Sequence, residues 1–74
     1  MRANLIQARN LAGLTQKAVA EVLGITIRHY QRIEAGDCAG RVHTWDALEK
    51  LLKTPQQILR ADNLRVLQTA EKNN

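Results

Sequence analysis

Gly13, Gly24 and Gly36 divide the first half of this 74-residue chain into short segments. Glycine readily adopts the left-handed backbone conformation that ends many helices. Thr15 and Thr26 each follow a glycine by two residues, and threonine is a good residue for the start of a helix. Good helix formers dominate the sequence and alternating strand-like runs are missing. This punctuation predicts short helices with very short connections, and therefore an all-α fold.

The same signals predict five helices, at about residues 2–12, 16–23 and 27–35, from near Thr44, and after Thr54. Thr54 is expected to cap the fifth helix, with Pro55 in its first position and Gln57 completing a capping box. Apolar residues at helical spacing predict the core, which comprises Leu5, Ala8, Ala12, Val19, Ala20, Leu23, Ile25, Tyr30, Ile33, Trp45, Leu48, Leu51, Leu52, Ile58 and Leu59.

A chain of this length has room for one modest core. We expect residues 1–61 to form that domain and residues 62–74 to form a C-terminal extension. Leu64, Val66 and Leu67 would extend the fifth helix or form a short extra one, whereas residues 71–74 would fray. No apolar run approaches the roughly 20 residues that cross a bilayer, and the N-terminus lacks a secretory signal. Cys38 is the one cysteine, so no internal disulfide is possible, which fits the cytoplasm.

The charge of the chain favours a polyanionic partner. Its net charge is +4 and its pI is about 9.9. Most of the excess lies before Trp45, where six basic residues face three acidic ones, which gives +3. Many small basic domains bind no nucleic acid, so charge alone does not decide the function.

The segment from Gln16 to Ala35 is more informative. Two helices joined by one glycine turn must cross steeply, and Ala20 is small enough to stand where their backbones approach. Gly24 supplies the left-handed turn between them. This is the helix-turn-helix arrangement, whose second helix can lie in the major groove of DNA.

The chain resembles the lambda-repressor-like (Cro/repressor, xenobiotic-response-element-type) helix-turn-helix regulators. The matching residues are Leu5, Arg9, Gly13-Leu14-Thr15-Gln16, Val19-Ala20, Leu23-Gly24-Ile25-Thr26, Tyr30 and Ile33-Glu34-Ala35-Gly36. The resemblance implies a compact five-helix domain that binds double-stranded DNA, commonly as a dimer, and represses or controls transcription. The alternative is a protein-interaction module of the same fold, such as an antitoxin-like or anti-regulator subunit. Leu64, Val66 and Leu67 would serve a dimer seam or a partner site, or would cap the core.

The predicted helix 27–35 places a mixed set of side chains on one arc, at about 100° per residue. Four of them are candidate base-reading residues: Ile27, Arg28, Gln31 and Arg32. Arginine pairs with guanine and glutamine with adenine through two hydrogen bonds, and an aliphatic group contacts the thymine methyl. Arg32, at the edge of the arc, could bind phosphate instead, and the alternative for the whole arc is a solvated face.

Four further residues are candidates for the sugar-phosphate backbone. The N-terminus of a helix attracts phosphate, and Gln16 and Lys17 begin the predicted helix 16–23. Gln16 also matches the family's phosphate-binding glutamine. His29 and Arg41 would flank the interface, although plain solvent exposure is an equal alternative for His29 and Lys17. The resemblance further implies that Arg9 and Glu34 form a structural ion pair rather than contacting DNA.

No residue pattern predicts an enzyme, a cofactor or a metal. Cys38, His29 and His43 have no zinc-ligand spacing, and a nucleophilic Cys38 activated by His43 would lack an orienting group and a pocket. Trp45 and Tyr30 are expected in the core, although phosphate is one possible partner for the Tyr30 hydroxyl. We therefore expect a non-enzymatic domain without a small-molecule substrate or a membrane partner, and at least a homodimer on DNA.

Overall fold

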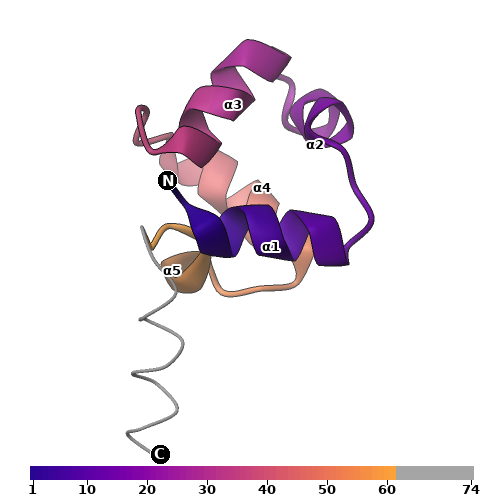
Figure 1. The fold of residues 1–74 in the computed structure, drawn as a ribbon, viewed down its shortest axis with the longest axis vertical. Coiled ribbons are helices and arrows are strands. Elements are labelled where there is room, and N and C mark those ends of the chain that lie inside the picture. The colour runs from indigo at the N-terminus through magenta and orange to yellow at the C-terminus, as the bar shows by residue number, and fades with distance from the viewer. Residues whose placement is uncertain (62–74) are drawn as a thin grey trace, which may run out of the picture.

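Five helices and no strand make up residues 1–61, the part of the chain that this computed structural model describes. They are α1 (Ala3–Leu11), α2 (Gln16–Leu23), α3 (Ile27–Ala35), α4 (Val42–Leu52) and α5 (Gln56–Leu59). Helices α2 and α3 lie at one end of the molecule and α5 at the other, with α1 between them (Figure 1). The all-α, five-helix prediction is confirmed. The predicted C-terminal extension, residues 62–74, lies outside the described residues.

The boundaries of α2 and α3 are those that the threonine and glycine signals predict. The Thr15 hydroxyl accepts a hydrogen bond from the Ala18 amide at 3.0 Å, and the Thr26 hydroxyl accepts one from the His29 amide at 3.1 Å. Gly24 ends α2 with a φ of 72° and Gly36 ends α3 with a φ of 88°. Both helices therefore begin and end where local backbone chemistry requires, and this fixes the length of α3.

Replacing Thr15 with alanine should lower the free energy of unfolding by about 1 kcal/mol, because the Ala18 amide loses its acceptor. Urea denaturation would measure the change. Thr15→Ser is the matched control, since serine keeps the hydroxyl and should retain most of the stability. If both variants were equally destabilised, the threonine methyl group rather than the cap would be responsible.

The predicted start of α4 is wrong by two residues. Helix α4 begins at Val42, and Arg41 occupies the capping position in an extended conformation without a side-chain cap. Thr44, the predicted start, is a buried residue of the first turn. The turn closes without a side-chain cap because the Thr44 and Trp45 amides donate to the Arg41 carbonyl at 3.0 and 3.1 Å.

The predicted capping box of α5 is also wrong. Pro55 is the capping residue rather than the first helical residue, and no side chain caps the helix. The Thr54 hydroxyl instead donates to the Leu52 carbonyl at 3.0 Å. Lys53 ends α4 in the left-handed conformation, with a φ of 52°. The chain therefore reverses directly after α4, and Thr54 completes the end of α4 instead of starting α5.

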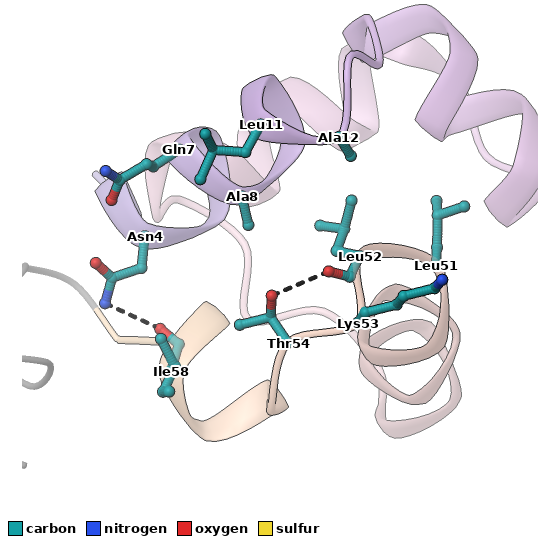
Figure 2. Close-up of a pocket in the computed structure, with 10 residues that line it drawn as sticks. All are labelled: Asn4, Gln7, Ala8, Leu11, Ala12, Leu51, Leu52, Lys53, Thr54 and Ile58. Atoms are coloured by element: carbon teal, nitrogen blue, oxygen red, sulfur yellow. Dashed lines mark hydrogen bonds between the residues drawn. The ribbon is translucent and has the colours of Figure 1, made fainter.

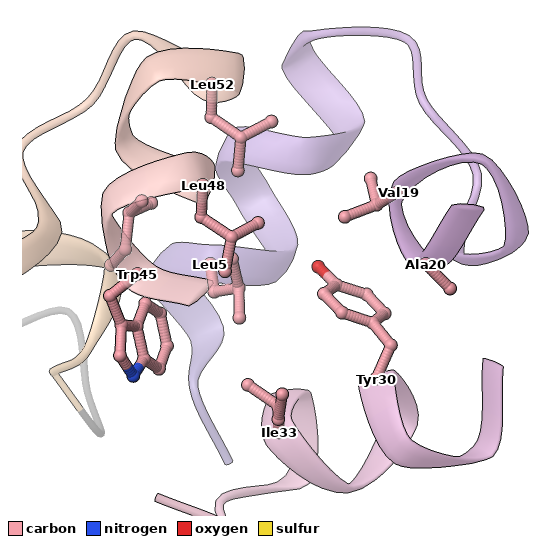
Figure 3. Close-up of a cluster of buried hydrophobic side chains, with 9 residues drawn as sticks. Leu5, Val19, Ala20, Tyr30, Ile33, Trp45, Leu48 and Leu52 are labelled. Atoms are coloured by element: carbon pink, nitrogen blue, oxygen red, sulfur yellow. The ribbon is translucent and has the colours of Figure 1, made fainter. Parts of the chain in front are cut away.

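The core gathers one side chain or more from every helix (Figure 3). The residues buried in it are Leu5, Val19, Ala20, Tyr30, Ile33, Trp45, Leu48, Leu52 and Leu59. Four other predicted core residues are only partly buried and pack against this cluster, namely Ala8, Leu23, Ile25 and Leu51. Ile58 is half-buried. Ala12 is exposed, and it lies just beyond the last residue of α1, Leu11. The inward side chains of α3 fix which of its faces is left in solvent.

Arg2 is a buried residue that the sequence patterns do not single out. Its Nη1 donates to the carbonyls of Ile33 and Cys38, and its Nε donates to the carbonyl of Arg60 at 3.3 Å. The guanidinium also lies over the Trp45 ring, 5.2 Å from its centroid. Arg2 therefore joins the end of α3, the following loop and the end of α5.

None of the described helices is long and apolar enough to span a bilayer.

Candidate nucleic-acid interface

Helix α3 has one buried face and one solvent face. Tyr30, Ile33 and Glu34 are buried on the side of α1 and α2. The four candidate base-reading residues, Ile27, Arg28, Gln31 and Arg32, are all exposed. Ile27 is 43% exposed, so an apolar side chain is accessible beside the polar ones. The structure therefore brings these four side chains together on one accessible surface.

Arg28 and Arg32 have no acidic partner among residues 1–61. Residues 1–61 contain an ion pair between Arg9 and Glu34. This pair does not involve the solvent face of α3. Both arginines line a shallow pocket with His29, Cys38 and Asp37, without an ion pair to Asp37. Their guanidinium donors are consequently accessible to an external acceptor.

Arg9 and Glu34 form the pair that the resemblance implies. Arg9 Nε lies 2.6 Å from Glu34 Oε2, and the side chains are 12% and 4% exposed. Arg9 Nη1 also donates to the Leu14 carbonyl at 2.8 Å. Arg9 therefore fastens α1 to the loop before α2 and to the end of α3, and its charge is neutralised within the domain.

Gln16 stands at the first residue of α2, but its side chain is engaged within the protein. Its Nε2 donates to Glu34 Oε1 at 2.8 Å, and its Oε1 accepts a hydrogen bond from Gln31 Nε2 at 3.1 Å. The second N–H of Gln16 Nε2 takes part in neither of these two hydrogen bonds. The sequence places both glutamines in the interface, but it does not indicate that they contact each other.

The other three candidate phosphate-binding residues, Lys17, His29 and Arg41, are exposed. Lys17 lies in the first turn of α2, where the leading backbone amides have no partner within the helix. His29 projects from the first turn of α3, and its Nε2 lies 3.6 Å from Cys38 Sγ. Arg41 precedes α4. His29 therefore lines one pocket with Arg28 and Arg32, whereas Lys17 and Arg41 lie outside α3.

The two aromatic side chains are core residues, as predicted. Trp45 Nε1 donates to the Ala39 carbonyl at 2.8 Å. Tyr30 is fully buried, so its hydroxyl cannot reach a phosphate. The phosphate contact considered from the sequence is therefore wrong. That hydroxyl has no hydrogen-bond partner among the described residues. Burial, together with the neighbouring Glu34 carboxylate, raises the pKa of Tyr30, so its hydroxyl stays protonated.

The cysteine and histidines do not form a metal centre in the described part of the chain. No group of three or more His, Cys, Asp or Glu side chains in residues 1–61 could hold a metal ion. The Sγ of Cys38 lies 3.6 Å from His29 Nε2. Cys38 lies in the loop after α3, and His43 is an exposed residue of α4.

A second candidate surface is formed by other helices than α2 and α3 (Figure 2). It is a pocket of about 490 Å³ between α1, the end of α4 and α5. Ala8, Leu11, Leu51 and Ile58 give it a largely apolar lining, and α3 contributes no residue to it. Leu11 is 82% exposed at its edge.

One comparison with known proteins matches the chain to a protein family. A family model described as helix-turn-helix matches residues 5–59, which include α2 to α5 and most of α1. Searches of curated proteins and of solved structures give no significant match. The matched range contains every candidate base-reading and phosphate-binding residue described above.

Proposed function

Because this chain belongs to the lambda-repressor-like (xenobiotic-response-element-type) helix-turn-helix family of DNA-binding transcription regulators, we propose that it is a sequence-specific repressor that reads the major groove with α3. The observation that carries the proposal is the solvent face of α3. Arg28 and Arg32 are exposed there beside Ile27. Neither arginine has an acidic partner among the described residues.

In the proposed complex, α3 lies in the major groove with its solvent face toward the bases. Tyr30 and Ile33, on the opposite face of the helix, point away from the DNA. The guanidiniums of Arg28 and Arg32 then reach guanine O6 and N7, and Ile27 reaches a thymine methyl group. The N-terminus of α2 and Lys17 meet a phosphate, and His29 and Arg41 approach the flanking backbone. Two copies would occupy an inverted repeat with half-sites about 10 base pairs apart. Repression follows if the bound protein blocks access to a promoter.

Titration of a labelled duplex at increasing salt concentration tests this function. A protein that neutralises phosphates releases counterions, so log K should fall linearly with log salt, with a slope of about −0.9 per phosphate contact. Lys17→Ala should make the slope less steep by about 0.9, the value of one phosphate contact, and it should weaken binding to all duplexes equally. Lys50→Ala is the matched control, because Lys50 is exposed near the end of α4, on a helix that carries none of the candidate base-reading residues. Binding that does not change with salt would contradict the proposal.

The second candidate function is a protein-interaction module, and the apolar pocket beside Leu11 favours it. An antitoxin-like or anti-regulator subunit would use such a surface to hold a partner protein. The two functions predict different effects of one substitution. Leu11→Asp should leave DNA binding unchanged if α3 is the functional surface, and it should abolish partner binding if the pocket is.

A further inference from the structure

The buried carboxylate of Glu34 determines how Gln16 is oriented. Glu34 Oε2 is taken by Arg9 Nε at 2.6 Å, and Glu34 Oε1 accepts from Gln16 Nε2 at 2.8 Å. An ionised carboxylate can only accept hydrogen bonds, whereas an amide has a donor side and an acceptor side. Gln16 must therefore turn its nitrogen toward Glu34. The opposite orientation would place the amide oxygen against a carboxylate oxygen.

The orientation of Gln16 in turn determines that of Gln31. With its nitrogen turned inward, Gln16 presents Oε1 to α3, and Oε1 accepts from Gln31 Nε2 at 3.1 Å. Since Gln16 offers only an acceptor there, Gln31 must offer its nitrogen. The Gln31 carbonyl oxygen is left as the acceptor of an exposed side chain on the solvent face of α3. We call this series of hydrogen bonds, from Glu34 through Gln16 to Gln31, the amide relay.

We infer that the amide relay makes Gln31 selective for a base that carries an amino group at its major-groove edge. A glutamine that can rotate freely is ambivalent, because its oxygen accepts from an amino group and its nitrogen donates to a keto group. With one N–H of Gln31 held by Gln16, the Gln31 oxygen accepts from adenine N6 or cytosine N4, and where that oxygen faces the base it opposes the keto oxygens of guanine and thymine. Adenine fits best, because the second N–H of Gln31 can reach adenine N7. This inference rests on the proposed function.

Selection of bound duplexes from a random pool tests the inference with four proteins: wild type, Gln16→Met, Gln31→Ala and Gln7→Met. The wild type should enrich adenine or cytosine over guanine and thymine at one position of each half-site, by about 5- to 150-fold. Gln31→Ala should lose the preference at that position only. Gln16→Met leaves Gln31 in place but removes the acceptor that holds it, so guanine and thymine should be admitted there. Gln7→Met, an exposed glutamine on α1, should behave as wild type.

The readout is a ratio of bases within the bound fraction, so a general loss of affinity in Gln16→Met does not alter it. If the wild type enriches no sequence at all, the proposed function fails and the inference fails with it. If the wild type enriches a site but Gln31→Ala changes no position in it, Gln31 reads no base and only the inference fails. The inference also fails alone if Gln16→Met keeps the wild-type exclusion of guanine and thymine.

Discussion

Replacing Glu34 with alanine should lower the free energy of unfolding by about 3–5 kcal/mol, the cost typical of removing one partner from a buried ion pair. Glu34 is 3% exposed, and its loss leaves the guanidinium of Arg9 without a counter-charge in a largely buried position. Gln16 loses its acceptor as well. A domain of this size is typically stable by only about 5–10 kcal/mol, so the variant should be largely unfolded at modest urea concentrations.

Urea denaturation monitored by the fluorescence of Trp45, the single tryptophan, would measure this loss. Glu21→Ala is the matched control, because Glu21 is an exposed carboxylate on α2 and should change stability by less than about 0.5 kcal/mol. The double variant Arg9→Met/Glu34→Met should recover much of the lost stability, since it leaves no buried charge unpaired. Equal effects of Glu34→Ala and Glu21→Ala would show that the pair does not stabilise the domain.

Arg28→Ala should have the largest single effect on DNA recognition. Loss of a guanidinium that grips guanine through two hydrogen bonds costs about 1–3 kcal/mol in binding to the preferred site, and it relaxes the preference at one base position. The stability of the fold should not change, because Arg28 is exposed and has no ion-pair partner among residues 1–61.

Competition between specific and random duplexes at fixed salt would separate the possible roles of Arg28. Lys17→Ala is the comparison, because a phosphate contact contributes equally to every sequence and its loss should weaken all duplexes alike. Arg28→Lys should keep the general affinity but not the preference for guanine, since an ammonium lacks the fork of the guanidinium. If Arg28→Ala weakened all duplexes to the same extent, Arg28 would bind the backbone rather than a base.

The sequence predicts α2 and α3 to the residue because their ends depend on local chemistry. Thr15 and Thr26 cap amides three residues away, and Gly24 and Gly36 adopt left-handed turns that other residues resist. The solvent face of α3 follows from the same boundaries, since a helix of known register has only one side opposite to its apolar residues. The family resemblance adds the pair of Arg9 and Glu34, whose contact spans 25 positions.

What the sequence does not predict depends on contacts between distant segments. Thr54 has the pattern of an N-cap, yet its hydroxyl bonds back to Leu52 because the turn at Lys53 brings the two together. Nothing in the sequence distinguishes Arg2 from the other basic residues until its carbonyl partners, 31 to 58 positions away, are known. The contact between Gln16 and Gln31 likewise requires the crossing of α2 and α3, which spacing alone does not give.

Glu34 neutralises Arg9 with one oxygen and holds Gln16 with the other. A mutation that altered this carboxylate to change the DNA site would therefore also weaken the fold. Ile27, Arg28 and Arg32 carry no such constraint, because they are exposed and lie outside the amide relay. Under the proposed function, a change of the preferred DNA site can begin at these three positions, whereas any base preference of Gln31 is coupled through Gln16 and Glu34 to the stability of the fold.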